Sequence, residues 1–153
     1  MTLIFNQIQH LKQEHYELLL EADPSKDLVD GYVKRSNTFE VLDDKELVGI
    51  VVLLETRPDS MEIVNISVDE RYQNKGIGQK ILSFSIQYAK DRNIVTLDIG
   101  TGSTSFSQLY LYQKMGFRLV GIDCDFFVHH YSEEIIENGL ILKDMVRLQL
   151  ILA

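Results

Sequence analysis

The order of elements along this sequence predicts an α/β domain of the mixed α+β kind, in which helices flank a mixed sheet. Two β-rich runs meet at the turn residues Asp43-Asp44-Lys45, a pattern typical of an antiparallel hairpin. A strand, an amphipathic helix and another strand follow between residues 60 and 100, and such a unit brings parallel strands together. The length of 153 residues, without a repeat or a proline-rich linker, predicts one domain over residues 1–153.

The first half of the chain is expected to contribute two helices and four strands. Residues 3–8 (LIFNQI) predict a short strand, and residues 8–22 carry apolar side chains at helical spacing. A second, shorter helix is expected over residues 26–35. Residues 38–56 predict the hairpin, and residues 60–68 (SMEIVNISV) predict the next strand.

The second half is expected to begin with a helix over residues 76–92, because its apolar side chains form one broad stripe. Residues 94–100 (IVTLDIG) are almost continuously apolar, which predicts a buried central strand. A helix over residues 105–115 is expected to end at Gly116, since glycine readily adopts the left-handed conformation of a C-terminal cap. Two further strands are expected, over residues 117–131 and 140–152.

Composition and charge exclude several classes of function. The chain is 45% apolar and 25% charged, as in ordinary globular proteins, and its formal net charge is −8. Such a field repels nucleic acid and anionic lipid and favours cations, and no basic run interleaved with aromatics is present. We therefore expect neither a nucleic-acid partner nor a membrane partner, and a cationic substrate is compatible with the charge.

Cysteine content and the N-terminus bear on the cellular compartment. The one cysteine, Cys124, excludes an internal disulfide and a cysteine metal cluster, and we expect it to be buried in a strand rather than to act as a nucleophile. The N-terminus has no basic leader with an apolar run, and no segment has the roughly 20 apolar residues of a membrane span. These features predict a cytoplasmic protein.

The stretch QNKGIGQKIL (residues 73–82) places two glycines at the start of the expected 76–92 helix. The first amides of a helix have no hydrogen-bond partner within the helix, and glycines let an anion approach these amides closely. A pyrophosphate group is therefore the expected ligand. A Walker loop is excluded, because no glycine is followed by lysine and then a hydroxyl residue. A dinucleotide-binding loop is excluded too, since Ile81 stands where a third glycine is needed.

Two motifs together resemble the GNAT superfamily of acyl-CoA-dependent N-acyltransferases. Gln73-Asn74-Lys75-Gly76-Ile77-Gly78 matches the signature Gln/Arg-x-x-Gly-x-Gly/Ala, and LYLYQKMGF (residues 109–117) is similar to the later motif, in which a tyrosine precedes a Lys-x-Gly-Phe turn. The resemblance extends over residues 45–130. It implies a mostly antiparallel sheet of about seven strands, splayed between the fourth and fifth, with acetyl-CoA in the gap.

The same resemblance assigns the residues that hold acetyl-CoA. Backbone groups of Ile66, Ser67 and Val68 are expected to pair with the pantetheine arm. Amides of the glycine loop are expected to hold the pyrophosphate: Gln73, Asn74, Lys75, Gly76, Ile77, Gly78 and Gln79. Many family members carry an asparagine before the last helix, where this chain has GTGSTSFSQ, so Ser103 or Ser107 is the candidate replacement.

Two residues are candidates for the chemistry. Tyr112 corresponds to the family's proton donor to the leaving thiolate, and the alternative is a purely structural tyrosine. Glu62 is the candidate general base, because it lies 11 residues before Gln73, a spacing similar to that of the catalytic glutamate in the histone-acetylating branch. Strict alternation groups Glu62 with Val64, Ile66 and Val68 on an apolar face that raises its pKa. Proton removal by waters alone is the alternative.

Other residues carry weaker indications. His129 and His130 are expected on a strand, where adjacent side chains point to opposite faces, so no metal site is expected. Lys75 and Lys80 either add positive charge near the phosphates or are plain surface lysines.

The sequence thus predicts an acetyl-CoA-dependent N-acetyltransferase that acts by direct attack of a primary amine in a ternary complex. The acceptor, a small polyamine, aminoglycoside or lysine-like compound or a peptide, is expected near Tyr32, Phe127 and Tyr131. The alternatives are a non-catalytic CoA-binding sensor and an enzyme that acetylates protein termini or lysines. A homodimer paired through the apolar C-terminal run DMVRLQLILA is a further expectation.

Overall fold

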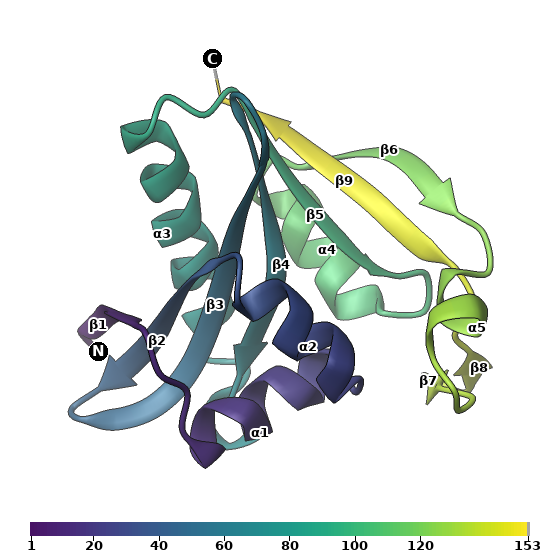
Figure 1. Cartoon of the computed structure of the whole chain (residues 1–153), viewed down its shortest axis with the longest axis horizontal. Helices are drawn as coiled ribbons and strands as arrows, with labels where there is room; N and C mark the ends of the chain where they lie inside the picture. Colours follow the sequence, from purple (N-terminus) through teal and green to yellow (C-terminus); the bar gives the residue numbers. More distant parts are fainter. Residues whose placement is uncertain (153) are drawn as a thin grey trace.

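The fold is a seven-stranded sheet with helices on both faces, as seen in the computed structural model, which describes residues 1–152 (Figure 1). The spatial order of its strands is β1-β2-β3-β4-β5-β9-β6, and β7 and β8 form a separate small hairpin. The strands are β1 (Leu3–Ile8), β2 (Asn37–Asp43), β3 (Glu46–Arg57), β4 (Ser60–Val68), β5 (Thr96–Gly102), β6 (Arg118–Asp123), β7 (Ile136–Glu137), β8 (Leu140–Ile141) and β9 (Met145–Ile151). The helices are α1 (Gln13–Ala22), α2 (Lys26–Val33), the 3-10 helix η1 (Glu70–Tyr72), α3 (Ile77–Asp91), α4 (Phe106–Lys114) and α5 (Phe126–His130).

Pairing in the large sheet is antiparallel everywhere except between β4 and β5, which are parallel. This confirms the mixed, mostly antiparallel sheet expected from the sequence. Asp44 and Lys45 both have positive φ values, 48° and 71°, and close the β2–β3 hairpin at the expected turn. The crossover from β4 to β5 runs through α3, whose length makes the parallel pairing possible.

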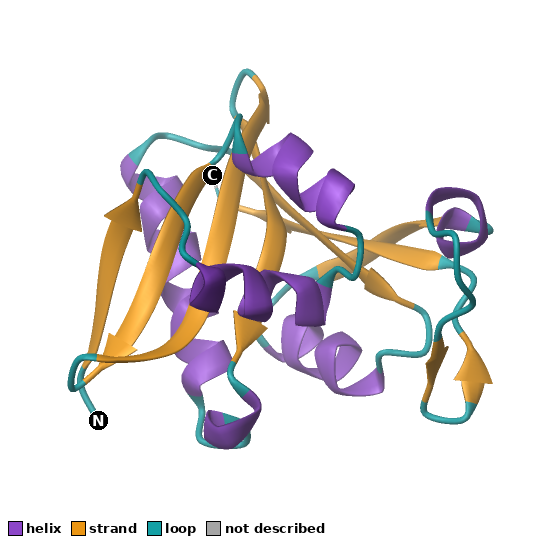
Figure 2. Ribbon diagram, turned by 60° about the horizontal axis from the view of Figure 1, so that its bottom comes forward, coloured by secondary structure: helices purple, strands orange, loops and turns teal. Residues whose placement is uncertain are grey.

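The two faces of the sheet carry separate apolar cores, which are covered by different helices (Figure 2). On one face, Ile81 and Leu82 of α3 pack with Val51 of β3. On the other face, Leu19 of α1 packs with Ile50 of the same strand. Six consecutive residues of β3, 48 to 53, are buried, because both faces of this central strand are covered.

One extra residue interrupts the regular alternation of β4. Val52 of β3 lies opposite Asn65, but the next residue of β3, Leu53, lies opposite Ile63, so Val64 is an unmatched residue in a β-bulge. Beyond the bulge the alternation changes phase: Ile66 packs on the α3 face, whereas Val64 packs on the α1 face. Grouping Glu62 with Ile66 and Val68 was therefore wrong, because strict alternation does not hold across the bulge.

The bulge also marks the place where β4 and β5 separate. Only four residue pairs join these strands, from Ser60↔Thr96 to Ile63↔Ile99, although β4 continues to Val68 and β5 to Gly102. Past Ile63 the cleft-side edge of β4 has no strand partner in the described chain. The expected splay between the fourth and fifth strands is thus confirmed.

The expected strand over residues 117–131 is correct only in its first half. β6 ends at Asp123, and Asp125 takes a left-handed conformation (φ 61°) that turns the chain into the short helix α5. His129 and His130 therefore lie on a helix, not on a strand. Cys124 lies in the turn before α5 and is exposed, so the expectation of a buried cysteine in a strand was wrong.

The expected strand over residues 140–152 is divided into two elements. Leu140–Ile141 form β8 of the small hairpin, and β9 begins only at Met145. Within the described chain β9 lies between β5 and β6 and is paired on both edges, so neither edge is free to extend a sheet into a second copy.

The bulge generates a testable prediction. Deletion of Val64 should leave Met61 and Ile63 on the α3 face and Asn65 and Ser67 on the other, because the phase on either side of the bulge already differs by one residue. We expect a folded protein whose melting temperature falls by about 3–8 °C, the equivalent of roughly 1–2 kcal/mol for the lost valine packing. Hydrogen exchange should show new protection at the amides of Ile66 and Val68, which point away from β3, because β4 extends its pairing with β5.

Deletion of Leu97 in β5 is the matched control, because β5 pairs with β4 and β9 without a register shift and every later side chain of β5 changes face. A Val64 deletion that unfolds the protein as severely as the Leu97 deletion would contradict the assigned register.

Candidate functional site

A cleft of about 930 Å³ opens where β4 and β5 separate. One wall is the end of β4, the next is the loop before α3 with the first turn of that helix, and the opposite wall is α4 with the tip of the β7–β8 hairpin. Eleven of the fourteen site residues expected from the sequence line this cleft: Ile66, Ser67, Val68, Gln73, Asn74, Gly76, Ile77, Gly78, Gln79, Ser107 and Tyr112. Glu62, Lys75 and Ser103 are not among its lining residues.

The β4 wall exposes main-chain hydrogen-bonding groups to the cleft. The amide of Asp69 donates to the Val48 carbonyl (2.8 Å), so Ser67, two residues earlier, also directs its backbone groups to β3. The residues between them, Ile66 and Val68, direct theirs to the open side. An extended ligand can therefore add itself to this edge of the sheet.

The N-terminus of α3 is built to accept an anion. Gly76 is its N-cap in the left-handed conformation (φ 81°), and Asn74 before it is left-handed as well (φ 62°). In the first turn of α3, the first amide that makes a helical hydrogen bond is that of Lys80, which donates to the Gly76 carbonyl (3.2 Å). The preceding amides have no helical partner and, with the helix dipole, produce a positive potential at the cleft.

The space around the two glycines suits a close-lying ligand. A β-carbon built on Gly76 meets no atom within 4 Å, and its positive φ alone accounts for glycine there. A β-carbon on Gly78 meets only the Leu111 side chain of α4, at 3.4 Å. A larger side chain at Gly78 would therefore occupy the gap between α3 and α4.

Tyr112 lies in the cleft wall on α4 and is only 4% exposed. Its ring is 6.3 Å from that of Phe117, and the Phe117 amide donates to the Tyr112 carbonyl at 3.0 Å. Burial raises the pKa of the phenol well above its ordinary value of 10, so the hydroxyl remains protonated at neutral pH. Tyr112 therefore contributes a buried, protonated phenol to the wall of the cleft.

Glu62 lies on β4 just before the bulge, with 27% of its side chain exposed. Burial raises the pKa of this carboxyl, and Asp98 on β5 acts in the same direction, while the Arg147 guanidinium opposes both from 3.8 Å. Arg147 is itself held by Asp123 at 2.7 Å. The expectation of a raised pKa is confirmed, although the apolar face invoked for it was not the correct one.

Two expected cofactor residues lie beside the cleft rather than in it. The Lys75 ammonium sits over the Tyr72 ring, 5.5 Å from its centroid. The Ser103 amide donates to the Asp144 carbonyl at 2.9 Å, which ties the end of β5 to the start of β9. Ser107, in the first turn of α4, is the serine of the pair that faces the cleft.

The tip of the β7–β8 hairpin is a part of the site that the sequence did not reveal. Glu137 accepts hydrogen bonds from the hydroxyls of Thr104 (3.1 Å) and Ser105 (2.6 Å), and Asn138 donates to the Thr104 carbonyl (2.8 Å). Both hairpin residues line the cleft. Asn138-Gly139 is a strong turn signal, but it does not tell which part of the fold the turn contacts.

The residues expected around an acceptor form a network next to the cleft. Asp23, after α1, accepts hydrogen bonds from the Tyr32 hydroxyl (3.0 Å) and from the Tyr131 hydroxyl (2.8 Å). Asn65 donates to the Tyr32 oxygen at 2.8 Å, and Phe127 stacks on Tyr131 with centroids 5.4 Å apart. The network joins the N-terminal helices to the segment after α5, but the cleft itself is lined there by Glu21 and Ala22.

Two kinds of feature are absent from residues 1–152, the part of the chain that the structure describes. No group of three or more His, Cys, Asp or Glu side chains is arranged there to hold a metal ion. No helix in that range has the length and apolar character needed to cross a membrane.

Comparison with known proteins identifies relatives of the whole chain. Residues 5–117 match the model of the Acetyltransferase (GNAT) family. An uncharacterised N-acetyltransferase, YvbK of Bacillus subtilis (strain 168), is 50% identical over 142 residues, which cover 93% of this chain and 92% of the relative.

Solved structures of similar proteins have the same fold. A Bacillus subtilis acetyltransferase in complex with CoA superposes with a TM-score of 0.95 at 48% identity, over 99% of this chain and 100% of the other. A GNAT family acetyltransferase from Elizabethkingia anophelis with acetyl-CoA bound gives a TM-score of 0.94 at 40% identity, over 97% of each chain.

The raised pKa of Glu62 generates a prediction for stability. A carboxyl whose pKa is higher in the folded state binds its proton more tightly there, so at neutral pH its ionised form destabilises the fold. Glu62→Gln should therefore raise the melting temperature at pH 7.5, and the gain should shrink as the pH falls through the raised pKa and then the unfolded-state pKa. Calorimetry across this pH range measures the effect.

Glu55→Gln serves as the control, because Glu55 lies at the exposed end of the neighbouring strand β3. A Glu62→Gln protein that is less stable than the parent at pH 7.5 would mean that the ion pair with Arg147 outweighs the burial of the carboxylate.

Proposed function

The chain belongs to the Acetyltransferase (GNAT) family and is an acetyl-CoA-dependent N-acetyltransferase, and on that premise we propose that it acetylates a primary amine by direct attack in a ternary complex. The observation that carries the proposal is the cleft between β4 and β5, which has free helix amides at one end and the Tyr112 side chain in its wall. In this class of reaction acetyl-CoA supplies the thioester carbonyl that the amine attacks.

The glycine loop holds the pyrophosphate in this proposal. Its support is the run of unbonded amides before Lys80, the left-handed Asn74 and Gly76, and the open space beside Gly76. The side chain of Gln73 donates to the Val68 carbonyl (3.1 Å), which fixes the loop to the end of β4. Lys75 and Lys80 add positive charge from outside the cleft.

The pantetheine arm pairs with the free edge of β4 through Ile66 and Val68, as an added strand would. Asn138 completes the opposite wall and takes the role for which Ser103 and Ser107 were the sequence candidates. The side-chain nitrogen of Asn138 donates a hydrogen bond to the Thr104 carbonyl. The side-chain oxygen of Asn138 is then free to accept a hydrogen bond from an amide of the pantetheine arm.

Tyr112 donates a proton to the leaving thiolate. A phenol whose pKa is raised by burial stays protonated through the neutral range, and the thiolate of ordinary pKa about 8.5 leaves more readily when it is hydrogen-bonded or protonated. Because the Tyr112 side chain is packed against Phe117, its hydroxyl is held in one position.

Glu62 removes the proton from the attacking ammonium through a water. A free alkylammonium has a pKa near 10 and must lose its proton to attack, and Glu62 lies outside the cleft lining, so a bridging water carries the proton. Burial raises the pKa of Glu62 toward the working pH, while Arg147 keeps the carboxyl ionised enough to act as a base. Activity then falls as the pH drops through this raised pKa.

The acceptor is a small amine that enters beside the end of α1. Glu21 brings a carboxylate to the cleft there, and the net charge of −8 favours a cation. The Asp23–Tyr32–Tyr131 network fixes the neighbouring wall, since both hydroxyls donate to one carboxylate.

The first functional prediction concerns Tyr112. Tyr112→Phe should lower kcat about 100-fold and change the KM for acetyl-CoA by less than threefold, because the proton donor acts in the transition state and not in binding. A thiol-release assay with acetyl-CoA and a panel of amines and peptides measures both parameters.

Tyr88→Phe is the control, because Tyr88 is a buried tyrosine on α3 that does not line the cleft. If Tyr112→Phe keeps the parental turnover, Tyr112 has a structural role and is not the proton donor. If the parent protein binds CoA but releases no thiol with any amine or peptide, a non-catalytic CoA sensor is the correct function instead. Release with peptides alone would identify a protein acetyltransferase.

The second prediction concerns the donor site. Gly78→Glu should weaken CoA binding at least 100-fold, because a bulky carboxylate then lies against the phosphates and Leu111. Gly78→Ala should change affinity by less than fivefold, since its β-carbon makes only an ordinary contact. Asn138→Ala should weaken binding about fivefold through one lost hydrogen bond. Calorimetric titration with CoA tests all three, and near-parental affinity in Gly78→Glu would place the pyrophosphate elsewhere.

A further inference from the structure

One strip of the large sheet lies between two groups of helices on the face opposite α3. Figure 1 shows α1 and α2 over the middle of the sheet, and α5 with the β7–β8 hairpin beyond β9. Met61 and Ile63 pack on the α3 face, so Glu62 between them points to the opposite face, into this strip. Arg147 of β9 lies 3.8 Å from Glu62, and the two side chains are 35% and 27% exposed. Solvent therefore reaches the strip.

This strip is the side from which an acceptor reaches the thioester. The donor lies against α3 and α4, which pack on the other face of the sheet. An amine whose proton passes to Glu62 must come from the face on which Glu62 lies. The cleft meets that face at Glu21 and Ala22, the end of α1. The acceptor entrance is therefore bounded by the end of α1 on one side and by the segment after α5 on the other.

A side-chain hydrogen bond crosses this entrance. The Tyr131 hydroxyl donates to Oδ1 of Asp23 at 2.8 Å and joins positions that are 108 residues apart. Within residues 1–152 it is the one hydrogen bond between segment 9–36, which carries α1 and α2, and segment 124–144. The cleft lining ends at Ala22 and includes neither Asp23 nor Tyr131. The bond therefore lies just outside the cleft, where the two walls meet.

Asp23 is the fixed half of this contact. Its Oδ1 also accepts a hydrogen bond from the Ser25 amide (3.2 Å), and its Oδ2 accepts one from the Tyr32 hydroxyl (3.0 Å). The Tyr32 oxygen in turn accepts from the Asn65 side chain of β4 at 2.8 Å. Asp23 is thus held on the α1–α2 side of the entrance whether or not Tyr131 is bonded to it.

Tyr131 is the half that can move. It follows α5 directly, and residues 131–135 form neither helix nor strand. Its ring stacks on Phe127 of α5, with the centroids 5.4 Å apart. Residues 132–134, which come next, are exposed. A segment without regular structure or buried side chains opens at a lower cost in free energy than the sheet does.

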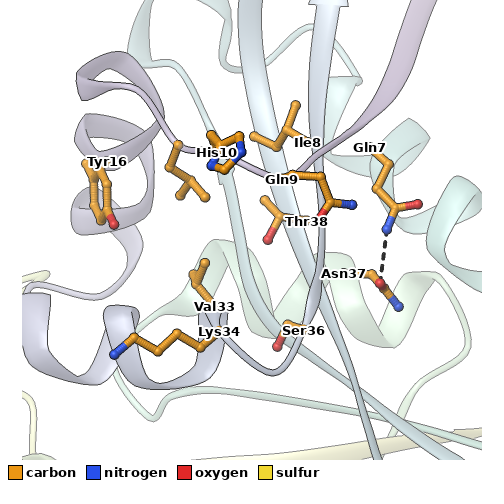
Figure 3. Close-up of a pocket in the computed structure, with 11 residues that line it drawn as sticks. Gln7, Ile8, Gln9, His10, Tyr16, Val33, Lys34, Ser36, Asn37 and Thr38 are labelled. Carbon is orange, nitrogen blue, oxygen red and sulfur yellow. Dashed lines mark hydrogen bonds between the residues drawn. The ribbon is translucent and has the colours of Figure 1, made fainter.

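A second hydrogen bond between a tyrosine and an aspartate provides a comparison. The Tyr16 hydroxyl donates to Asp30 at 3.0 Å and joins α1 to α2. Tyr16 lies beside a hollow of about 340 Å³, which shares no lining residue with the acetyl-CoA cleft (Figure 3). Loss of this bond loosens the pair of helices but leaves the entrance crossed, because both partners belong to the same wall.

We propose that the Tyr131–Asp23 hydrogen bond is a latch across the acceptor entrance, which makes the enzyme selective for slender, unbranched primary amines. An unbranched alkylamine passes beside the closed latch, whereas a bulky branched amine needs Tyr131 to leave Asp23. The branched amine then binds about tenfold more weakly, the equivalent of one lost hydrogen bond to a carboxylate. The inference deepens the proposed function and depends on it, because the role of Glu62 identifies the entrance.

The test uses butylamine and neopentylamine as probes, because both are primary amines and only the second carries a bulky tert-butyl group. Amide NMR titration of the full chain saturated with CoA measures both dissociation constants. The parent should bind butylamine at least tenfold more tightly than neopentylamine. In Tyr131→Phe this ratio should fall at least fivefold, whereas Tyr16→Phe, the matched control, should keep the parental ratio.

Three results would overturn the latch: the parental ratio in Tyr131→Phe, equal affinities of the parent for the two amines, or no saturable shift with either amine. Thiol release from acetyl-CoA separates this failure from that of the proposed function. Release with butylamine, together with a parental ratio of kcat/KM for the two amines in Tyr131→Phe, refutes the latch alone. No release with any amine or peptide refutes the proposed function and the latch with it.

Discussion

One extra residue in β4 determines most of what this structure can do. Val64 has no counterpart on β3, so the ladder changes phase between Ile63 and Asn65. The neighbouring parallel strand follows β4 for only four pairs and then leaves it. A regular β4 would extend its pairing with β5 and close the sheet. Because it is bulged, it presents main-chain groups along an open edge, and the cleft opens between this edge and α4.

The electrostatics of the cleft depend on local dipoles rather than on the total charge. A chain of net charge −8 is a poor receptor for an anion such as CoA at long range. At contact distance, however, the first amides of α3 dominate the local potential, because they line the cleft and have no partners within the helix. This end of the cleft is therefore positive although no basic cluster lines it.

The glycine loop and the order of elements could be predicted from the sequence because their signals are local. The turn at Asp44, the stripe of α3 and the glycines at 76 and 78 each reflect a preference within a few neighbouring residues. The bulge at Val64 was missed because Val64, Ile66 and Val68 fit a regular strand, and only the polar Asn65 and Ser67 in phase with Met61 and Ile63 mark the change. The short helix α5 was missed because FFVHH is rich in β-favouring residues, and only the left-handed Asp125 starts the turn. The contact of Asn138 with Thr104 joins positions 34 residues apart, which no local pattern specifies.

The position of β9 has a consequence for how the chain is made. β9 is the last strand in sequence, yet it lies between β5 and β6, and β6 pairs with no other strand of the large sheet. During synthesis β6 therefore emerges from the ribosome with both edges unpaired and its side chains exposed, and it stays so until β9 inserts beside it. The wall of the cleft built from α4 and the β7–β8 hairpin is completed late, after the part of the sheet from β1 to β4 can already have formed. A nascent chain thus carries the wall made by β4 and α3 before the opposite wall exists.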